Sequence, residues 1–397
     1  MLKRGMAVVS VYTVAQDVIA ERWPDHADGD AASVYGSDHH RIFDEVTSLG
    51  VEVVAVVPAM DSAVRLADLL ADLLGVPGNG SELALPRRDK AAMRRHAEKH
   101  GLRIPRFEVV ADPERIPAAA ASVGFPAICK HTTGGGSHGT RLVPSPEAAA
   151  GLRRSGLHQR DLFGSTVTQW LVEQYVRGRE FAVNCFSHGG RHRVVDVWEY
   201  RQPGPQDYDF PYWESAQISP DDPDWEKVTS YVLRVLEAFD IRLGPTHTEV
   251  KAAPDGVHLM EIGTRLPGGP MTDQWLNHSD LDPFEQALDC YLGKQPACVA
   301  TPVAFRRFCG ASAIRNDGPA GTLTRIEGLE AVRRMPGVDK VLSVYRPGDH
   351  VPVTDSTRNI PVGVWVAAAT PAGVIELLQQ VRDTVRLVIR PDEGGPR

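Results

Sequence analysis

Two acidic side chains are predicted to face each other across a β-hairpin. The segments Thr246–Ala253 and His258–Thr264 have strand-like patterns, and the turn sequence Pro254-Asp255-Gly256 separates them. In a hairpin centred on that aspartate, Glu249 lies opposite Glu261, because both are equally far from the turn. Like charges directly opposite each other destabilise a sheet. A pair of this kind therefore implies either a bridging cation or exposure to solvent.

The neighbouring residues favour a cleft over free solvent. His247 and Lys251 share a face with Glu249, and Gly263 and Arg265 share a face with Glu261. The opposite face is mainly apolar and carries Thr248, Val250, Met260 and Ile262. Mg²⁺ prefers carboxylate oxygens and substrate phosphates, and an arginine there could hold a phosphoryl group or a carboxylate. The alternative is a solvated lattice of salt bridges.

A glycine run follows the predicted strand Pro126–His131. The run is not a dinucleotide motif, because the next segment, Thr140–Val143, is predicted to be a strand instead of a helix. It is not a P-loop either, since no Gly-Lys-Ser/Thr closes it. A loop between antiparallel strands can fold over phosphates and donate backbone N–H groups to them. The candidates are Gly135, Gly136, Ser137, His138 and Gly139, and a plain flexible loop is the alternative.

Two lysines fit the phosphate interpretation. Lys130 ends the strand that enters the glycine run, and Lys90 opens a helix that Asp89 can cap. A lysine at the N-terminus of a helix opposes the helix dipole, and an anionic ligand would explain it. Either lysine alone is more commonly a solvated surface group.

The segment Thr168–Val176 is predicted to be a strand that could present its backbone to an adenine. Its end carries Glu173, Gln174, Tyr175 and Val176. Glu180 follows and could accept hydrogen bonds from ribose hydroxyls. The alternative for this segment is an ordinary amphipathic strand.

The order of elements indicates an α/β and α+β protein. Strands at Ala7–Val11 and Val51–Val57 alternate with helices at Ser37–Leu49 and Ala63–Leu74, which predicts a parallel sheet covered by helices. Short strands and Ala-rich helices follow, and a separate α/β unit is expected after Thr301. We expect domains at 1–84, 85–300 and 301–397, the second with subdomains at about 85–172 and 173–300.

Composition restricts the classes of partner. The chain has 397 residues with a net charge of −8 and no basic stripe, which argues against nucleic acid. Five cysteines without a CxxC pair favour a reducing compartment. No apolar run reaches the roughly 20 residues that span a bilayer. The expected location is therefore the cytoplasm, with a signal peptide in Met1–Gln16 as the weaker alternative.

Taken in order, these pieces resemble the ATP-grasp superfamily and, within it, the L-amino acid ligases that make dipeptides. The resemblance covers about residues 5–385 and includes Lys90, Lys130 with GGGSHG, VEQYVRGRE, HTEVK at 247–251 and EIGTRLPGG at 261–269. It implies that Lys90 and Lys130 bind nucleotide phosphates and that Glu180 binds ribose. Glu173, Tyr175 and Val176 would form the adenine hinge. Glu249 and Glu261 would bind metal, and Arg265 would bind phosphate. Many relatives have Asn where this chain has Thr264.

The resemblance implies an ATP-grasp fold and an ATP-dependent carboxylate–amine ligase. The expected product is an amide of the dipeptide type, formed through an acyl phosphate with release of ADP and phosphate. The implied cofactors are ATP and Mg²⁺, with Mn²⁺ as a substitute, and the implied partners are small carboxylate and amine substrates, amino acids first. Lys130 and Arg265 are the catalytic candidates, and Thr132–Gly139 and Gln202–Asp222 are candidate lids.

Three matters stay open at this stage. One alternative is an ATP-grasp ligase that uses a non-amino-acid carboxylate or amine. A second alternative is a nucleotide-binding regulatory protein that has lost the chemistry. The sequence does not give the oligomeric state, although homodimers are common among similar enzymes.

Overall fold

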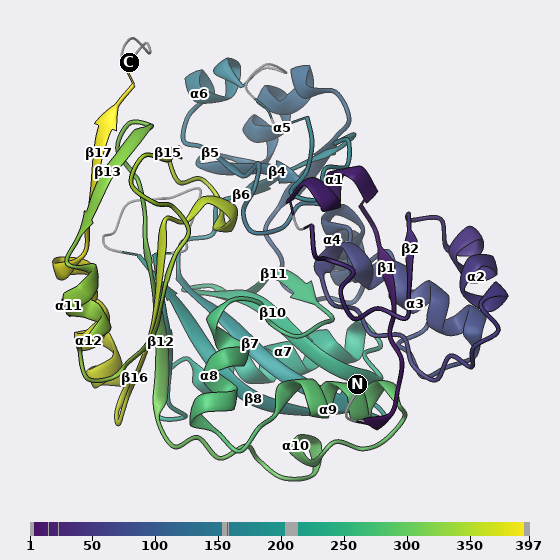
Figure 1. Cartoon of the computed structure of the whole chain (residues 1–397). Helices are drawn as coiled ribbons and strands as arrows, with labels where there is room; N and C mark the ends of the chain where they lie inside the picture. Colours follow the sequence, from purple (N-terminus) through teal and green to yellow (C-terminus); the bar gives the residue numbers. More distant parts are fainter. Residues whose placement is uncertain are drawn as a thin grey trace.

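The computed structural model describes residues 4–14, 16–22, 24–152, 157, 159–202 and 213–392. Its elements form four sheets with two, four, eight and three strands. Figure 1 shows the first helices and strands beside the large sheet, the four-stranded sheet above it, and the last strands along its opposite edge. Among the described residues, none of the helices combines the length and hydropathy needed to cross a bilayer.

The N-terminal elements build the small parallel sheet. Strand β1 (Val9–Tyr12) pairs in parallel with β2 (Ala32–Tyr35), and helix α1 spans Gln16–Arg22. Helix α2 (His39–Ser48) and helix α3 (Asp61–Leu74) agree with the helices predicted from the sequence. Apolar residues of α2 and α3 are buried against both strands, which is the reason that the amphipathic pattern predicts them well.

The predicted strand Val51–Val57 is wrong, because this segment pairs with no strand. The partner of β1 is β2, which the sequence analysis did not predict. Val53 and Val56 pack against the core of the small sheet, whereas Ala55 and Val57 pack against a different core. An extended segment between two cores has the same apolar pattern as a strand, although it makes no ladder hydrogen bonds.

The antiparallel four-stranded sheet has the order β3-β6-β4-β5. Its strands are β3 (Phe107–Val110), β4 (Ala127–His131), β5 (Arg141–Val143) and β6 (Trp170–Gln174). A 3₁₀ turn (Pro113–Arg115), helix α5 (Ile116–Val123) and helix α6 (Pro146–Gly151) complete this unit. Strands β4, β5 and β6 agree with the predicted strands Pro126–His131, Thr140–Val143 and Thr168–Val176. Helices α5 and α6 are the Ala-rich helices that the sequence predicts for this region.

The eight-stranded sheet has the order β11-β10-β7-β8-β9-β12-β16-β14. Its strands are β7 (Arg179–His188), β8 (Arg191–Arg201), β9 (Glu214–Gln217), β10 (Leu243–Ala253), β11 (Gly256–Gly263), β12 (Phe308–Ile314), β14 (Val338–Ser343) and β16 (Val362–Ala368). Three of these strands come after residue 301, so the sheet continues across the domain boundary that the sequence suggests. The boundaries themselves stay a prediction.

Helices cover both faces of this sheet. Helix α4 (Lys90–Lys99) and helix α7 (Trp225–Ala238) pack on one face and form the largest core. The other helices are α8 (Pro270–His278), α9 (Pro283–Tyr291), α10 (Ala297–Ala300), α11 (Leu329–Arg333) and α12 (Pro371–Thr384). A three-stranded sheet of β15 (His350–Val351), β13 (Gly321–Glu327) and β17 (Arg386–Pro391) lies at the C-terminus.

The hairpin of β10 and β11 confirms one prediction and corrects another. Glu249 pairs with Glu261, as expected. Nearer the turn the pairing is shifted by one residue, so that Val250 pairs with Leu259. A β-bulge between Glu249 and Val250 accounts for the shift. Leu259 instead of Met260 therefore opposes Val250 in the buried core. Met260, which the sequence analysis placed on the apolar face, lines the pocket described below.

Arg87 joins the N-terminal elements to the end of α7. Its side chain is buried and lies 3.0 Å from the Asp68 carboxylate on α3. The rest of its guanidinium donates to the backbone oxygens of Gly80, Asn79, Phe239 and Asp240 at 2.8–3.0 Å. Every donor of this buried cation therefore has an acceptor.

We predict that Arg87→Ala lowers the free energy of unfolding by about 3–5 kcal/mol, because it leaves a buried carboxylate without its cation. Chemical denaturation of the full chain measures this. Arg65→Ala is the control, since Arg65 is an exposed arginine on α3, the helix that carries Asp68; surface changes usually stay within about 0.5 kcal/mol. Equal losses in the two variants would contradict the assignment.

Candidate active site

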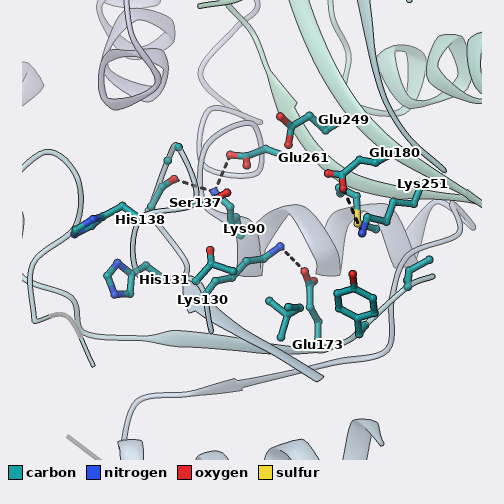
Figure 2. A pocket seen from close by; sticks show the side chains of 18 of the residues that line it. Lys90, Lys130, His131, Ser137, His138, Glu173, Glu180, Glu249, Lys251 and Glu261 are labelled. Carbon is teal, nitrogen blue, oxygen red and sulfur yellow. Dashed lines mark hydrogen bonds and ion pairs between the residues drawn. The ribbon is translucent and has the colours of Figure 1, made fainter. Parts of the chain in front are cut away.

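A pocket lies between the four-stranded sheet and the hairpin of β10 and β11 (Figure 2). All predicted site residues except Gly139 and Arg265 line it. The lining residues are Lys90, Ile128, Lys130, His131, Gly134, Gly135, Gly136, Ser137, His138, Thr140, Glu173, Gln174, Tyr175, Val176, Glu180, Gln202, Glu249, Lys251, Met260 and Glu261. Segments more than 170 residues apart thus converge on one cavity, as the ion pair between residues 90 and 261 illustrates.

The two facing glutamates share one wall of the pocket with Lys90. Figure 2 shows Glu249 next to Glu261, with Lys90 reaching toward the latter. The Lys90 ammonium lies 2.7 Å from Glu261 Oε1 and donates to the Gly134 carbonyl oxygen at 2.8 Å. Lys90 is the first residue of α4, and the Asp89 side chain caps that helix by accepting from the Ala92 N–H. The lysine therefore offsets part of the repulsion between the carboxylates.

The donor set at this wall fits a hard divalent ion. Two carboxylates face each other across the hairpin, and Mg²⁺ commonly takes one or two carboxylates together with substrate phosphates. Within the described residues, no group of three His, Cys, Asp or Glu side chains could form a complete protein cage for a metal. An ion held here would take its remaining ligands from water or a substrate.

Glu173 holds two cations on the opposite wall. Its Oε2 accepts from Arg94 Nε at 3.0 Å, and its Oε1 pairs with Lys130. Burial raises the pKa of Glu173, but the charges of Arg94 and Lys130 outweigh burial and hold that pKa below its usual value. Burial also affects Lys130. It lowers the pKa of this lysine, and the charge of Glu173 offsets only part of the shift. Both carboxylate oxygens of Glu173 are therefore engaged by cations, and its predicted place in an adenine hinge stays a prediction.

The glycine run folds back over His131, which is almost fully buried. A Cβ atom on Gly139 would collide with the His131 ring, so this glycine is needed for packing and does not line the pocket. Ser137 has a φ of +58°, a left-handed conformation that turns the loop sharply. Thr357, in the 3₁₀ turn Thr357–Asn359, donates its N–H to the Gly136 carbonyl oxygen at 3.1 Å.

Lys251 and Glu180 form an ion pair of 3.2 Å at the end of the pocket that contains Tyr175. The Lys251 ammonium also lies 4.8 Å above the centroid of the Tyr175 ring. Burial raises the pKa of Glu180, and the charge of Lys251 opposes that effect. Lys251 was not among the predicted site residues. The signal was available, since it lies two residues after Glu249 and alternate strand residues share a face.

Arg265 is held by Asp61, the first residue of α3. Its Nε and Nη2 donate to the two Asp61 oxygens at 2.7 and 2.6 Å, a bidentate pair. Burial raises the pKa of Asp61, but the Arg265 charge more than offsets this, so the pKa falls below its usual value. A Cβ on Gly135 would lie 3.8 Å from Asp61, which places the pair beside the glycine run. No local pattern points to Asp61, because 204 residues separate it from Arg265 along the chain.

Comparisons with known families agree with this arrangement. Residues 123–273 match the model of the ATP-grasp domain, and residues 318–390 match the L-amino acid ligase C-terminal domain 2. The chain therefore contains an ATP-grasp domain followed by an L-amino acid ligase C-terminal domain. Enzymes of this superfamily use ATP with Mg²⁺, which fits two facing carboxylates beside a glycine run and two lysines. The resemblance found in the sequence is thereby confirmed.

Relatives of this ATP-grasp chain include two named ligases. It is 24% identical over 345 residues to dapdiamide A synthase of Enterobacter agglomerans, covering 83% of this chain and 78% of that protein. It is 23% identical over 378 residues to the L-arginine-specific L-amino acid ligase of Bacillus subtilis, covering 90% and 88%. The crystal structure of an L-amino acid ligase from Bacillus licheniformis has the same fold, with a TM-score of 0.76, 19% identity and coverage of 98% and 94%.

We predict that Lys251→Met weakens binding of a non-hydrolysable ATP analogue roughly tenfold, about 1.4 kcal/mol, because Glu180 and Tyr175 in the pocket lose the cation that holds them in place. Calorimetry on the full chain measures the affinity. Lys340→Met is the control, since Lys340 is an exposed lysine that also lies over an aromatic ring, that of Trp365, on the sheet edge. An unchanged affinity in the Lys251 variant would show that this lysine does not act at the nucleotide.

Proposed function

We propose that this ATP-grasp protein joins the carboxylate of one amino acid to the amine of another, forming a dipeptide-type amide. The carboxylate attacks the γ-phosphate of ATP and gives an acyl phosphate and ADP. The amine then attacks the acyl carbon, and phosphate leaves. The observation that carries the proposal is the facing pair of Glu249 and Glu261 beside Lys90, Lys130 and the glycine run. The relationship to L-amino acid ligases supports the dipeptide product.

Each wall of the pocket has a separate task in this scheme. Glu249 and Glu261 would hold Mg²⁺, or Mn²⁺ in its place, which supplies positive charge at the phosphates. Lys90 and Lys130 reach into the pocket from the two sides and meet the phosphate chain. The backbone N–H groups of Gly135–His138, which line the pocket, cover the phosphates. The cations are fixed before the substrate arrives, so little reorganisation is needed when charge develops.

The remaining proposed contacts belong to the nucleoside. Gln174, Tyr175 and Val176 lie at the end of β6 and receive the adenine, and Glu180 accepts from the ribose hydroxyls. The ion pair with Lys251 holds Glu180 in place for that task. The position of these residues around one cavity and the match to the ATP-grasp domain support these roles.

An acyl phosphate must be protected from water until the amine attacks. We propose that Thr132–Gly139 excludes water, because this segment lines the pocket. Of the second candidate lid, Gln202–Asp222, Gln202 lines the pocket as well. Residues 203–212 lie outside the described residues. Trp213–Asp222 returns to the large sheet through β9.

The experiment that tests the function is ADP release measured against a matrix of amino-acid pairs, with product masses. A dipeptide mass with stoichiometric ADP is the expected result. Amides formed only with other amines or other carboxylates would replace the dipeptide assignment with a different ATP-grasp ligase. Binding of ATP without ADP release across the whole matrix would favour a regulatory protein.

We predict that Glu261→Gln abolishes ADP release. The amide removes one of the two carboxylate charges that would hold the ion, and it also breaks the Lys90 ion pair. The measurement is steady-state ADP formation at saturating ATP. Thermal unfolding should stay close to that of the wild type, since Glu261 is not fully buried. Turnover like that of the wild type would remove the metal assignment.

We predict that Arg265→Ala lowers kcat at least about tenfold, which corresponds to about 1.4 kcal/mol of transition-state stabilisation. Asp61→Asn separates two roles of the arginine. It keeps Arg265 but weakens the contact that holds it, so its loss of kcat should be smaller than that of Arg265→Ala. An unchanged rate in Arg265→Ala would show that the pair is only structural.

A further inference from the structure

A row of polar residues runs through the eight-stranded sheet to the proposed metal ligand. Asp196 on β8 pairs with Asn184 on β7, and Asn184 pairs with His247 on β10. These three are cross-strand neighbours on one face of the sheet. Glu249 lies two residues after His247 and so shares that face. The row ends where the pocket begins, although none of its three members lines the pocket.

Asp196 anchors the row from the interior. Its Oδ2 accepts from Trp198 Nε1, Trp275 Nε1 and Gln217 Nε2, each at 2.7 Å, and these three donors carry no charge. The indole nitrogens can only donate. The Gln217 amide is oriented too, because its oxygen accepts from the Cys309 N–H at 2.9 Å. The surroundings therefore fix Asp196 as an acceptor.

Each hydrogen bond of the row is donated toward Asp196. Asn184 Nδ2 donates to Asp196 Oδ1 at 2.7 Å, which turns the Asn184 oxygen toward His247 Nδ1, also at 2.7 Å. An amide oxygen only accepts, so Nδ1 carries the hydrogen. Nε2 then points at the pocket wall. It lies 3.2 Å from the Tyr200 hydroxyl and 3.6 Å from Glu249 Oε1, to which Tyr200 also donates at 3.3 Å.

A purely structural explanation fits this row poorly. Burying a carboxylate without a cationic partner is costly, and apolar side chains of similar volume usually pack there at lower free energy. Burial accordingly raises the pKa of Asp196, even though four hydrogen bonds oppose the shift. Outer hydrogen bonds that orient metal ligands are a recognised use for such a network.

We propose that Asp196, Asn184 and His247 are positioning residues that hold the Glu249 carboxylate in the orientation needed to bind the divalent cation. This inference rests on the proposed function, because it takes Glu249 as a ligand of that ion. The row fixes the ring of His247 from behind, and Nε2 of that ring lies 3.2 Å from the Tyr200 hydroxyl, which donates to Glu249 Oε1 at 3.3 Å. None of the three residues lines the pocket.

The test is Mn²⁺ binding to the full chain with a non-hydrolysable ATP analogue, followed by the electron paramagnetic resonance signal of free Mn²⁺. Two variants of His247 test the roles of its two ring nitrogens separately. In His247→Asn the amide replaces Nδ1 and nothing reaches Glu249, whereas in His247→Gln the amide occupies the place of Nε2. We expect His247→Asn to lose about tenfold or more in Mn²⁺ affinity. His247→Gln keeps a polar group beside Tyr200 and Glu249 but loses the bond to Asn184, so its loss of Mn²⁺ affinity should be smaller than that of His247→Asn.

Two further variants complete the comparison. Asn184→Leu keeps the volume but breaks the link, so it should weaken Mn²⁺ binding in the same direction as His247→Asn. His258→Asn is the matched control, because His258 is a buried histidine on the same hairpin that does not line the pocket. The control should bind Mn²⁺ like the wild type. If Asn184→Leu does not fold, the two His247 variants still decide the matter.

The outcomes separate this inference from the proposed function. Affinity like that of the wild type in His247→Asn would overturn the positioning role and leave the ligase proposal intact. Tight Mn²⁺ binding by the wild type without ADP release on any substrate pair would overturn the ligase and leave the positioning role intact. A wild-type chain that binds no Mn²⁺ would overturn both.

Discussion

The mutual repulsion of Glu249 and Glu261 is the constraint around which the rest of the pocket is arranged. Cross-strand pairing fixes the two carboxylates opposite each other, and an isolated pair of this kind destabilises a sheet. Lys90 lies 2.7 Å from Glu261 and offsets part of the repulsion. That contact needs α4 to begin beside the hairpin, which in turn needs the core between α4, α7 and the large sheet. The proposed metal site, the largest core and the first turn of α4 are therefore interdependent.

Buried charges elsewhere in the pocket are paired in the same manner. Glu173 lies between Arg94 and Lys130, Asp61 holds Arg265, and Glu180 pairs with Lys251. Breaking one member of such a pair is costly, because the other charge stays buried without compensation. The cations are thus fixed in the absence of substrate, and they surround a cavity in which phosphates would be stabilised. The polar row that begins at Asp196 extends the same principle to the orientation of Glu249.

The elements that the sequence predicted well have local signals. Helices α3 and α4 end at glycines, α4 begins after a capping aspartate, and the hairpin turn is marked by Pro254-Asp255-Gly256. The failures have non-local causes. Val51–Val57 looks like a strand because two cores bury its side chains, and Met260 faces the pocket because a bulge shifts the register. Neither the second core nor the bulge leaves a pattern in the sequence itself.

The sequence by itself determined that Glu249 faces Glu261, that a glycine run follows Lys130, and that the chain carries the motifs of the ATP-grasp superfamily. These features depend on residues close together along the chain, where turn geometry and strand alternation fix the outcome. Only the tertiary structure decided that Lys90 meets Glu261, that Asp61 holds Arg265, and that strands after residue 301 extend the large sheet. Such pairings join distant segments, and they are selected by the packing of whole elements and not by any local propensity.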